Sequence, residues 1–302
     1  MGNKITRKKF IIQGAAGLAA LGALSSAGSG EPIHNFAPRP LDNTGLVVPP
    51  ICYGAARVNE DSMVRFAIDR GLTFLDTGRS YANGNNERMV GRAIAGQREK
   101  VQIQSKIRLD PRDIQSGIDT RKGDGEITAA LTKRLEESLK ALNTNYIDIL
   151  LYHDASEESL LFHKSVMTFF ETKKSEGIIR TFGFSTHNDC LHLPERNNKE
   201  GFYEMMMLPF NFKGSYVHSL NKTYTEWDQN RLLAILRTAH EKGIGYIAMK
   251  TCSAGPYNPG GDAAASFPAA VDWVLNHDFV ASAAVAMSNF DELNEHLEAL
   301  KL

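Results

Sequence analysis

Four side chains have the types and spacing needed for proton transfer to a carbonyl group. Asp76 and Tyr81 stand five residues apart in "FLDTGRSY", and Lys106 and His153 lie at the ends of the apolar runs "VQIQSK" and "YIDILLYHD". A free phenol has a pKa of about 10, and a nearby lysine ammonium would lower that pKa. Asp76 could hold Lys106 in an ion pair, and a neutral His153 N–H could polarise a carbonyl oxygen. These groups predict proton transfer coupled to hydride delivery.

The segments that must position these groups alternate between short apolar runs and stretches with helical spacing. The runs predict strands at residues 47–54, 73–77, 101–106, 146–154, 180–186, 205–211, 245–250 and 280–287. The stretches predict helices at residues 59–71, 87–96, 126–143, 158–177, 188–201, 226–243, 267–278 and 290–301. This alternation predicts a single (β/α)8 TIM barrel over residues 31–302, with parallel strands. No Gly-x-Gly-x-x-Gly follows the first expected strand, which argues against a Rossmann domain.

In such a barrel the active site lies at the C-terminal ends of the strands. The polar residues expected there are Tyr53, Asp76, Lys106, His153, Ser185, Asn211 and Lys250, with Tyr81 in the loop after the second strand. The loops at residues 107–124, 212–225 and 251–265 are expected to form the walls of the site.

Each of the four candidates also has a purely structural interpretation. Asp76 could cap a turn, Tyr81 could pack on its loop, Lys106 could be solvated, and His153 could be a hydrogen-bonded strand end. Four suitable groups on consecutive strand ends favour an active site instead. A barrel glycosidase would need two opposed carboxylates, for which Asp76 and Asp154 are candidates, but the neighbouring lysine and tyrosine fit that chemistry poorly.

The chain resembles the aldo-keto reductase family from about residue 40 to its end. "FLDTGRSYANGNNERMVGRAI" is similar to the family signature, "QSKI" to its lysine strand and "LNTNYIDILLYHD" to its histidine segment. "EGIIRTFGFSTHN" and "DNTGLVVPPICYGAA" resemble, respectively, the family's Gly-x-Ser-Asn stretch and its N-terminal hairpin with the first strand. The resemblance implies a short N-terminal β-hairpin before the barrel. It also implies that Tyr81 is the general acid/base, that Lys106 and Asp76 tune it, and that His153 orients the carbonyl.

The resemblance further implies a nicotinamide cofactor and a small carbonyl or sugar substrate, with no metal. The residues expected to contact the cofactor are Asp76, Ser185, Thr186, Lys250, Ser288 and Glu295. Ala286 and Glu292 stand where members specific for the 2′-phosphate often have lysine and arginine, so the choice between NADP and NAD stays open. The strings "AMK" and "MSN" resemble strings found in a branch of the family that sometimes carries a C-terminal iron–sulfur extension. The cysteines needed for such a cluster are lacking, so we expect no iron–sulfur cluster.

Reduction of a carbonyl and oxidation of an alcohol, including a sugar, remain open as directions of the same reaction. The alternative from another class is a non-catalytic subunit that senses nicotinamide or binds a partner on the same barrel. Retention of all four catalytic residue types argues against that alternative, whereas Thr186, in place of the usual asparagine, keeps it open.

Composition and the N-terminal sequence indicate which partners and which cellular location to expect. The net charge is −1, so nothing global predicts nucleic-acid binding, and Cys52, Cys190 and Cys252 have no zinc or disulfide spacing. Residues 1–30 combine a basic start, an apolar segment and small residues, which predicts an export signal. "TRKKFII" resembles a twin-arginine signal with Arg7-Lys8 in place of two arginines. We expect export, into a bacterial periplasm, and membrane contact only if the signal stays uncleaved.

Overall fold

All eight apolar runs form strands of one closed parallel barrel in the computed structural model. The strands are β3 (Ile51–Gly54), β4 (Phe74–Asp76), β5 (Gln102–Ile107), β6 (Ile147–Tyr152), β7 (Ile179–Ser185), β8 (Met205–Pro209), β11 (Gly245–Met249) and β12 (Ser282–Ala286). They pair in that order, and β12 pairs with β3 to close the ring. The predicted (β/α)8 barrel is therefore confirmed.

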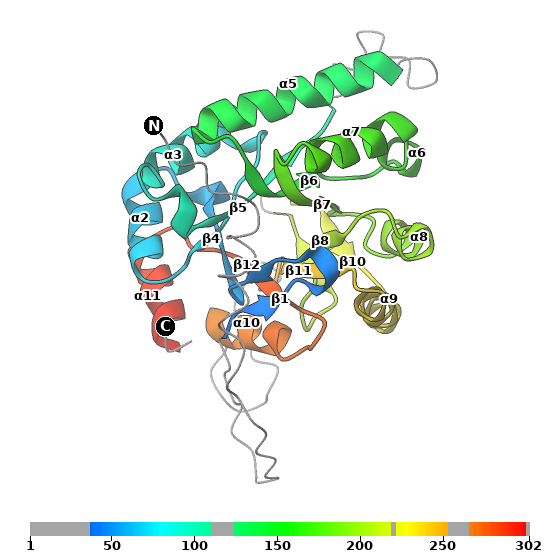
Figure 1. The fold of residues 1–302 in the computed structure, drawn as a ribbon. Helices are drawn as coiled ribbons and strands as arrows, with labels where there is room; N and C mark the ends of the chain where they lie inside the picture. Colours follow the sequence, from blue (N-terminus) through cyan, green and yellow to red (C-terminus); the bar gives the residue numbers. More distant parts are fainter. Residues whose placement is uncertain (1–36, 110–123, 219–221, 253–265, 300–302) are drawn as a thin grey trace, which may run out of the picture. The chain divides into compact units, whose positions relative to one another are not determined.

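A helix follows each barrel strand and covers the outside of the ring (Figure 1). The helices are α2 (Asp61–Asp69), α3 (Asn85–Ala93), α5 (Asp124–Leu142), α6 (Glu158–Leu161), α7 (Lys164–Ser175), α8 (His192–Glu200), α9 (Gln229–Glu241), α10 (Phe267–Leu275) and α11 (Phe290–Ala299). Short 3-10 turns are η1 (Asp42–Thr44), η2 (Ala55–Arg57), η3 (Tyr81–Gly84) and η4 (Arg98–Lys100). The single helix expected at 158–177 is wrong. His163 has an extended backbone and accepts the Ser165 N–H at 3.2 Å, which starts α7 as a separate helix.

The structure describes residues 37–109, 124–218, 222–252 and 266–299, within a unit that runs from Asn35 to Leu302. The predicted export signal at 1–30, most of the loop at 107–124 and most of the loop at 251–265 lie outside these residues. The export and periplasm assignments therefore stay predictions. Among the described helices, none is long and apolar enough to cross a membrane. The three cysteines are free.

Side chains alternate between the inside of the barrel and the layer beneath the helices. On β8, Met205 and Met207 belong to the inner cluster, whereas Met206 and Leu208 belong to the outer one. The antiparallel hairpin of β1 (Arg39–Pro40) and β2 (Val47–Val48) is present, as the resemblance implies. Its Leu41 and Val48 are fully buried in the inner cluster, so the hairpin closes the barrel interior.

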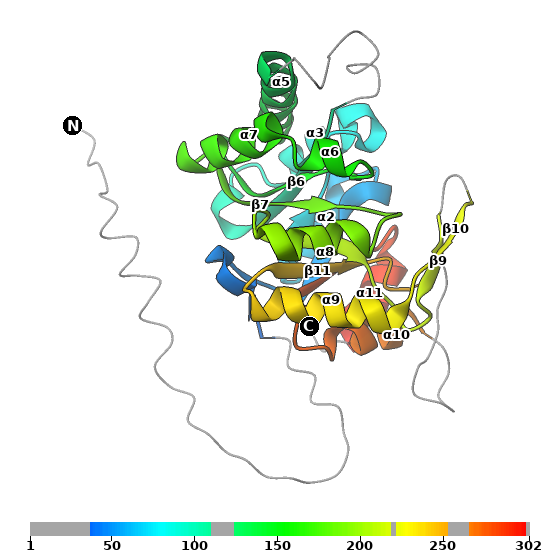
Figure 2. The ribbon, with the colours of Figure 1, turned by 90° about the vertical axis from the view of Figure 1, so that its right-hand side faces the viewer.

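A second hairpin extends the loop after β8. Strands β9 (Ser215–Val217) and β10 (Tyr224–Glu226) pair antiparallel and stand out from the barrel (Figure 2). The sequence predicted a loop at residues 212–225 and did not predict this hairpin. Tyr216 is 1% exposed and packs inward, whereas Tyr224 is 59% exposed.

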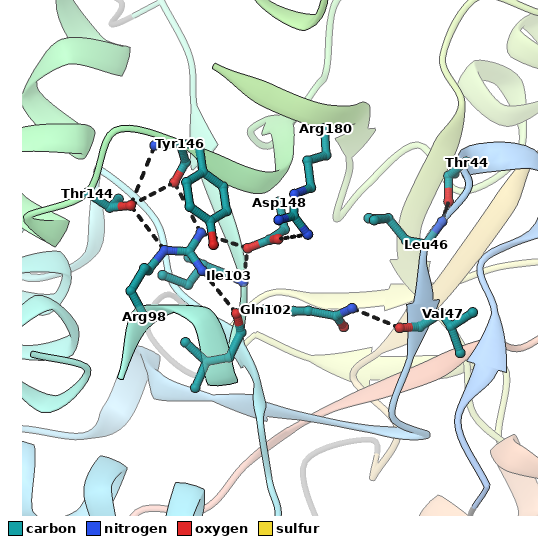
Figure 3. A network of polar contacts seen from close by, with 11 residues as sticks. Thr44, Leu46, Val47, Arg98, Gln102, Ile103, Thr144, Tyr146, Asp148 and Arg180 are labelled. Atoms are coloured by element: carbon teal, nitrogen blue, oxygen red, sulfur yellow. Dashed lines mark hydrogen bonds and ion pairs between the residues drawn. The ribbon is translucent and has the colours of Figure 1, made fainter. Parts of the chain in front are cut away.

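A buried ion-pair network ties the starts of three strands together at the end of the barrel opposite the predicted site (Figure 3). The Asp148 carboxylate pairs with Arg98 at 2.7 Å and Arg180 at 3.0 Å, and accepts the Ile103 N–H at 2.9 Å. The two guanidinium groups lie 3.8 and 4.8 Å from the centre of the Tyr146 ring. Since Asp148 is 1% exposed, these partners must replace the water that would otherwise solvate its carboxylate.

Replacing Asp148 with alanine should therefore lower the free energy of unfolding by about 3 kcal/mol, the usual cost of breaking a buried ion pair. Urea unfolding followed by circular dichroism measures this loss. The matched control is Asp69→Asn at the exposed end of α2, which should change stability by less than about 0.5 kcal/mol. A loss below about 1 kcal/mol for Asp148→Ala would show that the network contributes little.

Candidate active site

Lys106 and Asp76 form a buried ion pair at the ends of β5 and β4. Lys106 is 1% exposed and Asp76 is 4% exposed, and the ammonium donates directly to Asp76 Oδ1. The ammonium also donates to the Thr77 carbonyl at 2.8 Å, and Gln104 Nε2 donates to the same Asp76 oxygen at 2.6 Å. Burial alone would lower the pKa of Lys106, but the Asp76 carboxylate and Tyr81 outweigh it and raise that pKa. Lys106 is therefore a charged ammonium at neutral pH.

Tyr81 lies over this ammonium at the start of η3. The Lys106 Nζ atom is 4.9 Å from the centre of the Tyr81 ring, and the His153 ring meets the Tyr81 ring edge-on at 5.5 Å. Burial raises the pKa of Tyr81, and the Lys106 charge opposes that rise without cancelling it. The expectation of a lowered pKa is thus wrong in net direction, although the effect of Lys106 has the expected sign. Tyr81 is a neutral phenol able to donate a proton.

His153 supplies a neutral imidazole beside the tyrosine. Burial, followed by the charges of Lys106 and Arg108, holds the pKa of His153 well below its usual value. The Ser80 hydroxyl lies 3.1 Å from Nδ1 of the ring. Ser80 directly precedes Tyr81, so one loop carries the tyrosine and also orients the histidine.

A pocket of about 100 Å³ opens beside His153, with Arg108 and Asp154 in its wall. Their side chains pair at 2.8 Å and are 38% and 34% exposed. Asp154 has a left-handed backbone, with φ of 55°, and its N–H donates to Ser185 Oγ at 3.2 Å. Non-glycine residues in this conformation are concentrated at functional sites.

The four candidates therefore meet on one rim of a (β/α)8 barrel, and comparisons with known proteins agree. A profile of the Aldo/keto reductase family matches residues 50–262. The chain belongs to the aldo/keto reductase family. Its members are NAD(P)-dependent oxidoreductases that act on small carbonyl compounds.

Individual relatives match parts of this chain. Methylglyoxal reductase YeaE from Escherichia coli is 34% identical over 129 residues, which cover 43% of this chain and 39% of that protein. Aldo-keto reductase YhdN from Bacillus subtilis is 35% identical over 92 residues, which cover 30% of this chain and 26% of that protein. The chain thus spans less than half the length of these two relatives.

Solved structures share the fold of this chain. The aldo-keto reductase AKR11C1 from Bacillus halodurans, in its holo form, gives a TM-score of 0.66 at 20% identity and covers 88% of this chain and 91% of that chain. An aldo-keto reductase from Klebsiella pneumoniae in complex with NADPH gives a TM-score of 0.60 at 22% identity, with coverage of 86% and 88%. At these identities the likeness supports the barrel fold.

The residues predicted to contact cofactor fall into two groups. Ser185 and Thr186 are buried at the end of β7. The Ser185 hydroxyl oxygen accepts the backbone N–H of Asp154, which lies in the pocket wall. Lys250 has a left-handed backbone, its ammonium lies 5.4 Å from the Tyr216 ring centre, and burial followed by the charge of Arg57 lowers its pKa. Lys250 is close enough to the catalytic rim for the charges of Asp154 and Lys106 to act on its pKa as well.

Ser288 and Glu295 form the second group. Ser288 lies just before α11, Glu295 lies within it, and both are exposed. The Ser288 N–H donates to Glu292 at 2.6 Å. Among the described residues, neither Ser288 nor Glu295 forms a hydrogen bond with any of the four catalytic candidates. The cofactor roles of both groups remain predictions. No cluster of three or more metal-binding side chains occurs in the described part of the chain.

Sequence reasoning missed several polar residues around the site. Gln104 could have been found, because it precedes Lys106 by two positions and so shares its face of β5. Arg79 and Glu87 form an ion pair at 2.6 Å, and Glu87, 0% exposed, also accepts the Ser105 hydroxyl at 2.7 Å. No spacing rule distinguishes such a buried glutamate from one on the solvated face of a helix.

His187 is a further missed group near the site. Its pKa is lowered to about 3 by burial first and then by the positive charge of Lys250 and other neighbours. Its Nδ1 atom is buried without a hydrogen-bond partner among the described residues. The folded protein therefore keeps this imidazole neutral at pH values where the unfolded chain protonates it.

Stability should consequently fall as pH drops below about 6.5 and keep falling towards pH 3, by about 1.4 kcal/mol per pH unit for this histidine. In His187→Gln this contribution is absent, so the variant should gain about 2 kcal/mol relative to the parent between pH 7.5 and pH 5. Urea unfolding of both proteins at pH 7.5, 6 and 5 measures the difference. A difference that does not change with pH would contradict the prediction.

Proposed function

We propose that this chain is an NAD(P)(H)-dependent oxidoreductase that interconverts a carbonyl compound and an alcohol, with Tyr81 as general acid/base. The observation that carries the proposal is the Lys106 ammonium, held by Asp76 and 4.9 Å from the centre of the Tyr81 ring. A buried lysine and a phenol at this separation can share and stabilise the charge that proton transfer creates.

Proton transfer follows from the protonation states of these residues. In the reducing direction, the neutral Tyr81 hydroxyl donates its proton to the substrate oxygen as negative charge develops there. The adjacent Lys106 ammonium stabilises the phenolate that remains, while Asp76 and the Thr77 carbonyl keep the ammonium in place. Neutral His153 donates an N–H to the carbonyl oxygen and so orients it. In the oxidising direction the phenolate accepts the proton.

The residues around the rim fit a nicotinamide dinucleotide. Lys250 is half-buried and lies close enough to Arg57 for that charge to lower its pKa, so two cations are available for a diphosphate. The Ser185 hydroxyl oxygen accepts the N–H of Asp154, a residue of the pocket wall. When bound, the cofactor supplies or accepts the hydride. The relative named methylglyoxal reductase makes a small 2-oxoaldehyde the first substrate to test.

A non-catalytic nicotinamide-sensing or interaction subunit is the alternative function. Thr186 replaces the family's usual asparagine, and its hydroxyl already accepts the Asp189 N–H at 3.2 Å. A chain of this kind would bind cofactor without turning over a carbonyl compound.

Replacing Tyr81 with phenylalanine decides between the two functions. It removes the proton donor without emptying its space, so kcat for carbonyl reduction should fall about 10²- to 10⁴-fold. Tyr224→Phe, at a 59% exposed position, is the matched control and should retain activity. NADH and NADPH oxidation with a panel of aldehydes measures turnover, and fluorescence titration measures cofactor binding. Turnover that survives in Tyr81→Phe would refute the mechanism, and cofactor binding without turnover in the parent would support the sensing subunit.

Glu292 should disfavour the 2′-phosphate of NADP. The resemblance implies that this phosphate would bind near residues 286–292, where the Glu292 carboxylate already accepts the Ser288 N–H. Glu292→Gln removes the negative charge, so the Kd for NADPH should fall about tenfold, equivalent to about 1.4 kcal/mol, while the Kd for NADH changes little. Glu298→Gln, exposed on the same helix, is the control for both titrations. Equal changes in both Kd values would place the 2′-phosphate elsewhere.

A further inference from the structure

The loop that carries Tyr81 makes a tight turn with an unfavourable backbone conformation. Ala82 and Asn83 have φ of 47° and 53°, and Gly84 has φ of 83°. Left-handed conformations cost a residue with a side chain about 1–2 kcal/mol each. Such a turn persists only where its surroundings hold it, so the position of Tyr81 depends on contacts outside the turn.

The Arg79 side chain fills the inside of this turn. A Cβ atom on Gly84 would lie only 1.2 Å from Nη2 of Arg79, so the turn closes around the guanidinium group. Arg79 Nη1 lies 2.6 Å from Glu87 Oε2 and donates to the Glu137 carbonyl at 3.2 Å. The Arg79 side chain is 13% exposed, and its backbone N–H donates to the Lys106 carbonyl at 2.9 Å.

Glu87 joins the Tyr81 loop to the strand of Lys106. Its Oε2 atom binds Arg79, and its Oε1 atom accepts the hydroxyl of Ser105, the residue before Lys106. Glu87 and Ser105 are both 0% exposed, and burial raises the pKa of the Glu87 carboxyl despite these partners. One buried carboxylate therefore contacts both parts of the structure that carry the proposed proton-transfer pair.

We propose that Arg79 and Glu87 are positioning residues, which set the separation between the Tyr81 phenol and the Lys106 ammonium. This inference rests on the proposed function, because the separation matters only if Tyr81 transfers a proton. Without the Arg79 guanidinium the left-handed turn loses the group it encloses, and Tyr81 moves relative to Lys106. Misplacement of a reacting group by about 1 Å can cost about 10²-fold in rate.

Kinetics of three variants separate positioning from a merely structural role. Arg79→Met leaves Glu87 without its partner, so we expect a lower urea midpoint and a kcat lowered about 10- to 100-fold, with KM within about threefold of the parent. In Arg79→Met/Glu87→Met an apolar pair replaces the ion pair, so the urea midpoint should recover in part while kcat stays low; recovery is incomplete because the buried Ser105 hydroxyl has lost its acceptor. Gly84→Ala displaces the guanidinium and should lower kcat in the same way.

The matched control is the buried Arg98–Asp148 pair at the opposite end of the barrel, whose ion-pair distance is 2.7 Å. Arg98→Met should lower the urea midpoint and leave kcat and KM unchanged. The inference would be overturned if kcat recovered together with stability in the Arg79→Met/Glu87→Met variant. It would equally be overturned if Arg98→Met lowered kcat as much as Arg79→Met does.

A measurement that needs no turnover distinguishes failure of this inference from failure of the proposed function. In protein labelled with ¹³Cζ-tyrosine, the Tyr81 resonance is assigned by its loss in Tyr81→Phe. It should move in Arg79→Met and in Arg79→Met/Glu87→Met, and stay in place in Arg98→Met. An unmoved resonance in both Arg79 variants would refute the positioning role even in an active enzyme. If the parent turns over no carbonyl compound but the resonance moves, the proposed function fails and the placement of Tyr81 by Arg79 stands.

Discussion

The site depends on one buried ion pair, that of Lys106 with Asp76. Two nearly inaccessible charges are stable in a protein interior only when their remaining hydrogen bonds are also made. The Thr77 carbonyl and the Gln104 amide make them. The register of β4 against β5 pairs Asp76 with Gln104, which places Lys106 two residues further along the same face. The barrel therefore fixes where the charge lies, and Tyr81 and His153 are arranged around it.

Burial acts on these groups in opposite directions and thereby gives each a different protonation state. It disfavours every charged form, so it raises the pKa of Tyr81 and lowers the pKa of His153. Lys106 would also lose its proton more easily, but the Asp76 carboxylate reverses that effect. One enclosed rim thus contains a neutral acid, a neutral N–H donor and a fixed cation, which together match the charge changes of carbonyl reduction.

The strands and the catalytic rim were predictable because buried parallel strands are continuous apolar runs that end in polar residues. The helix boundary at His163 was not, since it depends on a single side chain capping α7. The pKa of Tyr81 is raised because the folded loop buries the phenol. The five-residue spacing from Asp76 does not predict that burial. Arg79 and Glu87 escaped notice because their pairing depends on a left-handed turn between them.

Three buried carboxylates of the barrel each pair with a basic side chain, and the type of basic side chain determines what the pair can do. Asp148 and Glu87 pair with Arg98 and Arg79, whose planar guanidinium groups form directional contacts suited to holding segments together. Asp76 pairs with a lysine, a compact charge that also lies next to a phenol. Because the lysine ammonium can stabilise the phenolate that forms when Tyr81 gives up its proton, this pair can support proton transfer. These two arginine pairs thus hold segments in place, whereas the lysine pair lies next to the proposed proton donor.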